Sequence, residues 1–357
     1  MFNGRRLYIA RVRRGMTSKS LAENAGIGVD TVTRLEQGRN TPSDDTLFRL
    51  SQALDYPLEF FYGDMVDEID IGAVSFRSFS KMTAKDRNAA IAAGTLGLLL
   101  NEWIEERFGL PQPDLLDLSR ESDPEAAAMH LRQHWGLGQQ PIGGLLSLLE
   151  SKGIRLFSLS ENTASVNAFS FWRGGKPFIY LNNFKTAESS RFDAAHELGH
   201  LVMHKHGDPK EDRSCEREAD RFASAFLMPS DDVRARISSN VTTDIILRGK
   251  MRWRVSAMAM AYRLRSLQLL SEWQYKSICI ELSRRGYRSG EPNGIEREIS
   301  SVWRKILAHL WQERITKEDI ARELSIPLDE LEGLVWSLTR ARDNPSISSR
   351  ANFQIIG

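Results

Sequence analysis

Residues 196–200 read His196-Glu197-Leu198-Gly199-His200, and the rest of the chain can be interpreted outward from this stretch. On a helix, residues four positions apart lie on the same face, so the two imidazoles can bind one metal ion from adjacent turns. Glu197 lies one position round the helix, where its carboxylate can act as general base toward a water molecule at that metal. The pattern is typical of zinc peptidases. The alternative is an exposed helix that carries two histidines by chance.

A catalytic zinc site uses three protein ligands and leaves a fourth position open. Residues 215–229 predict a second helix, because apolar residues recur on one face of this segment. Glu216 and Asp220 border that face, so Glu216 is the candidate third ligand and Asp220 the acceptor that orients a ligating histidine. Glu218 points about 160° away from Glu216 on the same helix, which makes the two glutamates exclusive alternatives. We prefer Glu216.

These motifs carry a family resemblance. The run Arg191-Phe192-Asp193-Ala194-Ala195, the HELGH motif and a Glu-x-x-Ala-Asp-x-Phe-Ala helix that ends in Leu-Met-Pro resemble the ImmA/IrrE metallopeptidases. The resemblance covers residues 167–229 and continues more loosely to residue 292. It implies an α+β zincin-like domain, Zn²⁺ held by His196, His200 and Glu216, and a repressor protein as the substrate. Histidine and carboxylate ligands also suit manganese or iron.

Composition restricts the class of protein. The 357 residues exceed one ordinary core, so two or three domains are expected. The net charge of +1 indicates no general affinity for nucleic acid or membrane, and two cysteines exclude a disulfide framework. The N-terminus lacks the apolar core of a signal peptide, and the apolar-rich run at 89–100 is too short to cross a bilayer. We therefore expect a cytoplasmic protein.

The sequence of residues 1–64 predicts five short helices. The turn Gly26-Ile27-Gly28 joins two of them, and this pair of helices forms a helix-turn-helix motif. The marks Leu-Ala-x-x-Ala-Gly-Ile at 21–27 and Leu-Glu-x-Gly-Arg-x-x-Pro at 35–42 resemble the XRE (Cro/repressor-like) family. In such domains the second helix of the motif enters the major groove of double-stranded DNA, and a dimer provides useful affinity. The alternative is a helical protein–protein module that has lost DNA binding.

Position in the motif assigns the candidate DNA contacts. Arg34 has the reach for a bidentate contact to guanine, whereas Asp30 is mildly unfavourable beside phosphates. The candidates are Val29, Asp30, Thr31 and Arg34 at base edges, Thr33 near the backbone, and Ser18, Lys19 and Arg39 at phosphates.

The remaining chain divides into four predicted parts. Residues 65–120 form a helical connector, residues 121–235 the metallopeptidase domain and residues 236–292 a helical extension. Residues 293–357 form a helix-turn-helix-like module, interpreted as a docking or dimerisation module, with a flexible tail. Within the peptidase domain we expect an alternating strand at 154–159. We also expect a hairpin of strands at 167–172 and 177–181, which by resemblance aligns an extended substrate.

Several other polar residues require an interpretation. His204 and His206 follow the motif and are expected to be solvated at the end of the helix, with extra zinc ligation by either as the alternative. Tyr262 is a weak candidate for the group that stabilises the oxyanion. Five basic residues form a further cluster, which we interpret either as a nucleic-acid or acidic-partner surface or as a solvated helix face. They are Lys250, Arg252, Arg254, Arg263 and Arg265.

These observations predict a DNA-binding regulatory zinc endopeptidase that cleaves a repressor protein and functions as a homodimer. The alternative is a transcriptional regulator whose zinc domain is a sensor or scaffold with little peptidase activity. A third version has the peptidase cleaving its own connector near residues 64–80.

Overall fold

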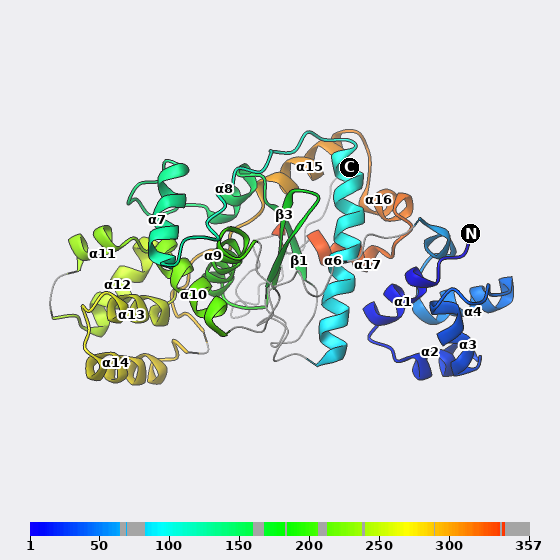
Figure 1. The fold of residues 1–357 in the computed structure, drawn as a ribbon, viewed down its shortest axis with the longest axis horizontal. Helices are drawn as coiled ribbons and strands as arrows, with labels where there is room; N and C mark the ends of the chain where they lie inside the picture. The colour runs from blue at the N-terminus through cyan, green and yellow to red at the C-terminus, as the bar shows by residue number, and fades with distance from the viewer. Residues whose placement is uncertain are drawn as a thin grey trace, which may run out of the picture.

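The computed structural model describes residues 1–64, 69, 83–159, 168–182, 184–205, 213–237, 240–288, 290–335 and 338–339. Helices dominate this part of the chain, and its three-stranded sheet lies near the middle of the molecule (Figure 1). The N-terminal helices lie at one end, and the helices of residues 230–284 lie at the other (Figure 1). The predicted fold class is confirmed: the chain is mainly helical and α+β, with all-α N-terminal and C-terminal regions.

The N-terminal domain contains the five predicted helical segments. They are α1 (Gly4–Arg13), α2 (Ser18–Ala25), α3 (Val29–Glu36), α4 (Asp44–Leu54) and the 3₁₀ helix η1 (Leu58–Tyr62). Gly26 ends α2 with a φ of 64°, a conformation that glycine adopts without steric cost, and this makes the tight turn into α3. Leu21, Val32 and Leu50 are buried between the helices. The period of the apolar residues therefore produces the expected helical core.

Helix α6 (Ala84–Glu105) lies between the sheet and the N-terminal domain (Figure 1) and contacts α1 and β1. Thr83 caps it, as its sequence position predicts, by accepting a hydrogen bond from the Asp86 backbone N–H. A Cβ at Gly97 would lie 2.2 Å from the Tyr180 hydroxyl, so glycine is required for the close approach of α6 to the sheet. No helix in the described ranges is long and apolar enough to cross a membrane. The connector segment proposed for self-cleavage lies mostly outside the described residues.

The sheet contains β1 (Arg155–Leu159), β2 (Phe169–Arg173) and β3 (Lys176–Asn182) in the order β1-β3-β2. Strand β1 is parallel to β3, whereas β2 and β3 form the predicted antiparallel hairpin through Gly174 and Gly175, both with positive φ. The prediction of an alternating β1 is wrong, because all five of its residues are buried. Helices α6 and α17 (Leu328–Val335) both contact this strand.

The HELGH motif lies on α9 (Ala187–Met203), and three other helices contact α9. They are α7 (Pro124–His134), α8 (Leu145–Ser151) and α10 (Arg213–Leu227). A Cβ at Gly199 would lie 3.0 Å from the Phe222 ring, which shows how closely α9 and α10 approach each other. Strand β2, one of the two outer strands of the described sheet, also contacts α9, the helix that carries the motif.

The helical extension contains α11 (Ser230–Arg236), α12 (Thr243–Trp253), α13 (Ala257–Ser266) and α14 (Glu272–Arg284). Neither interpretation of its basic cluster as one surface is correct, because Lys250 and Arg263 are each only 2% exposed. Lys250 pairs with Glu291, and Arg263 forms an ion pair with Glu125 and a hydrogen bond to the Met228 carbonyl oxygen. These cations connect elements of the fold.

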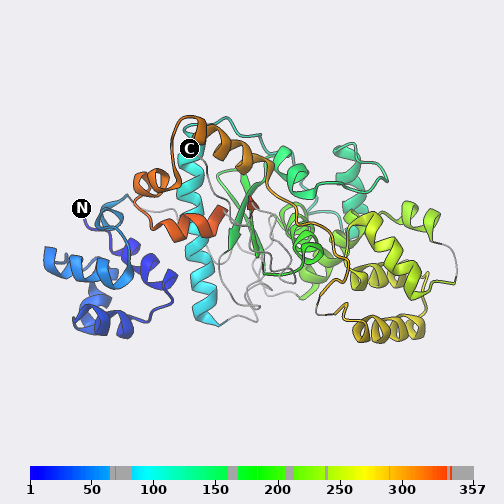
Figure 2. The ribbon, with the colours of Figure 1, turned by 180° about the vertical axis from the view of Figure 1, so that it is seen from behind.

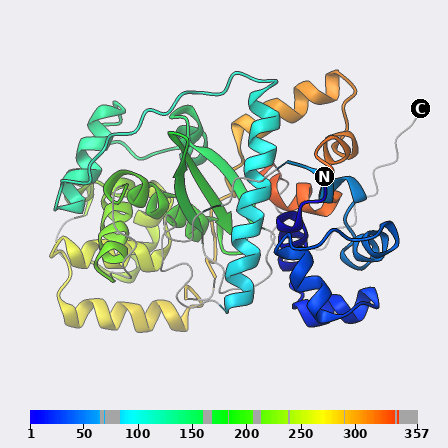
Figure 3. The same ribbon diagram turned by 45° about the vertical axis from the view of Figure 1, so that its right-hand side comes forward.

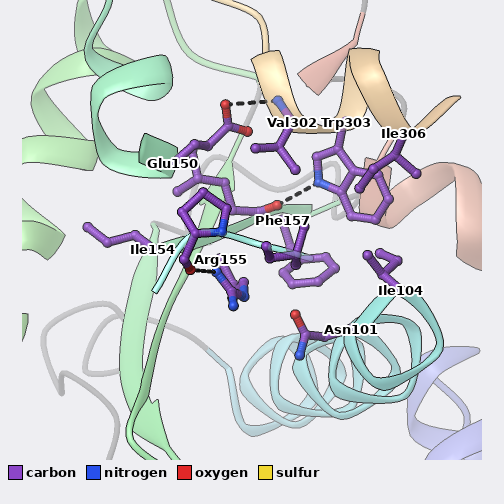
Figure 4. A pocket seen from close by; sticks show the side chains of 12 residues that line it. Asn101, Ile104, Glu150, Ile154, Arg155, Phe157, Val302, Trp303 and Ile306 are labelled. Atoms are coloured by element: carbon purple, nitrogen blue, oxygen red, sulfur yellow. Dashed lines mark hydrogen bonds between the residues drawn. The ribbon is translucent and has the colours of Figure 1, made fainter. Parts of the chain in front are cut away.

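The C-terminal module consists of α15 (Ser301–Gln312), α16 (Lys317–Glu323) and α17. Figure 4 shows the small pocket where α15 meets β1 and α6, with the Trp303 indole N–H donating to the Leu156 carbonyl and the Val302 N–H donating to Glu150. On its other side, α17 lies against the N-terminal domain (Figures 1 and 2). The module thus contacts both the sheet and the N-terminal domain, and its role in docking or dimerisation stays a prediction. The tail from residue 340 lies outside the described residues.

The contact between α17 and the N-terminal domain is an ion-pair network. The Glu330 carboxylate accepts hydrogen bonds from Arg13 at 2.7 and 2.9 Å and from the Tyr56 hydroxyl at 2.8 Å. The neighbouring Asp329 pairs with Arg14. The helix-turn-helix domain is thereby attached, through α17, to the sheet that lies beside the HELGH helix.

Candidate metal centre

Helices α9 and α10 bring the three predicted ligands together. His196 and His200 lie one turn apart on α9, and Glu216 lies in the first turn of α10. The Nε2 atoms of the two histidines are 3.1 Å apart. The Glu216 carboxylate oxygens lie 3.3 Å from Nε2 of His196 and 3.4 Å from Nε2 of His200.

These separations can be compared with the requirement of a zinc ion. Ligand atoms about 2.0–2.2 Å from a tetrahedral zinc lie roughly 3.3–3.6 Å from each other. The observed 3.1–3.4 Å is close to that range, and two imidazole nitrogens with one carboxylate are a ligand set that zinc accepts. The residues therefore fit a metal ion, with His196, His200 and Glu216 as the side chains that would hold it.

Each histidine directs its other ring nitrogen to a partner. Nδ1 of His196 lies 3.0 Å from Oδ1 of Asp220, so Asp220 occupies the orienting position that the sequence predicts. Nδ1 of His200 lies 3.0 Å from Nδ1 of His204, whose Nε2 lies 3.1 Å from a Glu218 carboxylate oxygen. The expectation of a solvated His204 is wrong, because only 16% of its side chain is exposed. The other residue of that prediction, His206, lies outside the described residues.

The side chains of the cluster shift one another's pKa values. Burial alone would lower the pKa of His196, but hydrogen bonds with Asp220 and Glu216 raise it to about 10. Burial lowers the pKa of His200. Burial would raise the pKa of Glu216, yet hydrogen bonds from both histidines hold it well below its ordinary value. Because protons and a metal ion compete for the same ligand atoms, metal binding here would release protons.

Glu197 lies beside these ligands and is only 2% exposed. Burial raises its pKa to about 7, against the opposing effects of His196 and of a hydrogen bond from Ser170. The Ser170 hydroxyl on β2 donates to Oε2 of Glu197 at 2.7 Å. A carboxylate with a pKa near neutrality is suited to taking up and returning a proton.

Sequence reasoning missed Ser170. Only the pairing of β2 with β3 and the contact of β2 with α9 place it next to Glu197. Tyr262 lies on α13 and is exposed. Among the described residues, no hydrogen bond or ion pair connects Tyr262 to the ligand cluster, so its role in catalysis remains a prediction.

The candidate DNA contacts lie on the surface of the N-terminal domain. Val29, Asp30, Thr33 and Arg34 on α3 are exposed, as are Lys19 on α2 and Arg39. Ser18 and Thr31 are partly exposed. Helix α3 lies on the side of this domain away from α16 (Figures 1 and 3). Docking through Arg13 at the end of α1 and the following Arg14 therefore leaves the predicted recognition helix facing outward.

Two family models match the chain. Residues 7–61 match a model described as a helix-turn-helix, and residues 149–265 match a peptidase-family model described as an IrrE N-terminal-like domain. The second match includes β1–β3, α9, α10 and most of α13. A comparison with curated proteins found no match.

Proposed function

The chain joins an XRE-type helix-turn-helix domain to an IrrE/ImmA-type metallopeptidase-like domain, and from this premise we propose that it is a DNA-binding zinc endopeptidase that cleaves a repressor protein. The observation that carries the proposal is the convergence of His196, His200 and Glu216 within 3.1–3.4 Å, beside a buried glutamate. Catalytic zinc sites use this number and kind of ligand.

The protein side chains would divide the work of peptide hydrolysis. His196, His200 and Glu216 would hold a zinc ion, which would supply Lewis acidity toward the scissile carbonyl and toward water. Glu197 takes a proton from the attacking water and returns it to the leaving amine nitrogen, so one carboxylate serves both steps. Ser170 fixes the orientation of that carboxylate through its 2.7 Å hydrogen bond. Asp220 orients His196 through Nδ1, which leaves Nε2 available to the metal.

The test replaces Glu197 by glutamine, which keeps the size of the side chain and removes the base. Full-length wild type and Glu197→Gln, each loaded with zinc, are incubated with a soluble extract of the source cells. New protein N-termini are then identified by mass spectrometry. We expect cleavage sites in a repressor protein with wild type only, because loss of a general base lowers the rate about 10²–10⁴-fold. The metal content of the two proteins should be equal.

Two results would contradict the proposal. One is the same set of new N-termini in both incubations, which would identify a contaminating peptidase. The other is zinc-loaded wild type that produces none. Glu272→Gln serves as the control, because Glu272 is an exposed glutamate on α14 that pairs with Arg265 and is not part of the metal centre.

DNA binding by the first domain is the second half of the proposal, and its support is the exposed α3. We expect Arg34→Ala to weaken binding to the operator by about 1–3 kcal/mol at the base that this side chain reads. Lys19→Ala should instead weaken binding to all sequences and reduce its dependence on salt. Selection of operator fragments from genomic DNA, followed by salt titration, separates the two effects. Equal binding of Arg34→Ala and wild type to every selected fragment would contradict the assignment.

The homodimer completes the proposal, since XRE-type domains gain useful affinity by binding paired half-sites. Sedimentation of the full chain with and without a selected operator tests it. One bound chain per operator would contradict it.

A second candidate function is favoured by the docking network. Arg13 and Tyr56 of the helix-turn-helix domain bind Glu330 on α17, and α17 contacts β1 of the peptidase-like domain. In this function the metal domain is a sensor or scaffold, and DNA binding is the output. A change in operator affinity on removal of zinc, together with no new N-termini in the extract, would select it over the peptidase.

A further inference from the structure

His204 terminates α9 four residues after His200, and its ring is directed back at the metal centre. Nδ1 of His204 lies 3.0 Å from Nδ1 of His200, and Nε2 of His204 lies 3.1 Å from Oε2 of Glu218. The three side chains therefore form a continuous line from one predicted ligand to a carboxylate on α10. What this line does depends on the proposed function, because it has a role in metal binding only if His200 is a ligand.

The positions of the ring protons determine which residue donates and which accepts in each hydrogen bond of this line. A neutral histidine that binds a metal through Nε2 carries its proton on Nδ1. His200 would then donate from Nδ1 to Nδ1 of His204, which has to accept. His204 carries its own proton on Nε2 and donates it to Glu218. Each hydrogen bond has one donor and one acceptor, so the whole line is satisfied with both histidines neutral.

The same residues could be interpreted as a second metal site. His204, Cys215 and Glu218 offer ligand atoms that lie within 4.8 Å of one another. Metal binding through Nε2 of His204 would leave its Nδ1 as the proton donor. Nδ1 of His200 would then face it with a second proton whenever the first metal is bound. The proton count therefore disfavours simultaneous occupation of both sites.

We infer that His204 and Glu218 are positioning residues that hold the His200 ring and make its Nε2 a better metal ligand. The two ligating histidines thus receive different support. His196 has the Asp220 carboxylate as a direct partner, whereas the Glu218 carboxylate reaches His200 through an intervening imidazole. Losing such a partner typically lowers metal affinity about 10–100-fold.

The test measures zinc affinity of the full chain by competition with a chromophoric chelator. We expect His204→Leu to lower the affinity about 10–100-fold, because leucine cannot accept the proton of His200. His204→Gln should recover most of that affinity through its amide oxygen, and Glu218→Gln should give a smaller loss than His204→Leu. The melting temperature of each metal-free variant serves as the folding control. The comparison of glutamine with leucine separates hydrogen bonding from packing, because a packing role alone would not distinguish the two side chains.

Two further measurements test for a second metal site: the metal content of Cys215→Ser, and the absorption spectrum after cobalt replaces zinc in the wild type. We expect one metal ion per chain, wild-type affinity in Cys215→Ser, and no thiolate-to-cobalt charge-transfer band. Two metal ions per chain, with one lost in Cys215→Ser, would overturn the inference in favour of a second site. Wild-type affinity in a folded His204→Leu protein would also overturn it, while leaving the proposed peptidase intact. A wild-type chain that binds no zinc would overturn both.

Discussion

Replacing Glu330 by glutamine removes the charge that attaches the helix-turn-helix domain to α17. The Glu330 side chain is 3% exposed, and that of its partner Arg13 is 7% exposed. Removing one member of a buried ion pair costs about 3–5 kcal/mol, because the other charge remains buried without compensation. We expect the lower limit, about 3 kcal/mol, because Arg13 also donates to the Ala89 carbonyl oxygen and retains that bond.

A loss of about 3 kcal/mol corresponds to a roughly 100-fold increase in the undocked population, since about 1.4 kcal/mol equals a factor of ten. Hydrogen–deuterium exchange with peptide resolution can measure it. The α1 and α17 amides should exchange faster in Glu330→Gln, whereas α9 and α10 should keep their protection. Faster exchange confined to the two docked helices would show that the network controls docking and not global stability.

The neighbouring Asp329 provides the matched control. It pairs with Arg14, but 61% of its side chain is exposed, and such pairs contribute about 0–1 kcal/mol. Asp329→Asn should therefore change the exchange of α1 and α17 several-fold at most. Equal exchange in Glu330→Gln and wild type, or equal effects of the two substitutions, would refute the reasoning.

Three further predictions concern the metal centre. Glu216→Gln should lose the metal ion, whereas Glu218→Gln should keep one per chain at saturating zinc, as measured by mass spectrometry; the reverse result would exchange their roles. Ser170→Ala should lower kcat about tenfold or more with unchanged metal content, because a hydrogen bond to a charged group contributes about 1.5–3 kcal/mol, and Ser170→Thr should restore it. With the pKa of His196 raised to about 10, zinc binding should release about one proton at pH 8. As the pH is lowered below 10, the zinc affinity should therefore fall about tenfold per pH unit, because protons compete with zinc for His196. Calorimetry in buffers of different ionisation enthalpy measures the number of protons released. Release of no proton would contradict a protonated His196.

The secondary structure was largely predictable because its signals are local. The period of the apolar residues, the capping hydroxyl of Thr83 and the turn glycines at 174 and 175 act within a few residues. The errors arose where a distant segment decides the environment. Strand β1 is buried on both faces because α17, more than 150 residues later in the chain, packs against it. Lys250 and Arg263 are buried because their acidic partners Glu291 and Glu125 come from other elements.

The candidate site shows the same division. The i,i+4 spacing of His196 and His200 by itself predicts two imidazoles on one helical face, because the helical repeat is a property of the backbone. Helix geometry predicts that only one of Glu216 and Glu218 can face the two histidines, because their side chains point in nearly opposite directions. Only the packing of α9 on α10 shows which one does: it brings Glu216 to Nε2 of His196 and Glu218 to His204.

The sequence by itself determined the helix-turn-helix, the hairpin and the HELGH helix, because short-range geometry and hydrophobic periodicity encode each of them. Tertiary structure alone decided three features. They are the Ser170 hydroxyl on Glu197, the His200–His204–Glu218 line, and the docking of α1 on α17. Each of these features includes side chains from at least two separate elements. The relative position of such side chains depends on how whole elements pack, and no local pattern records it.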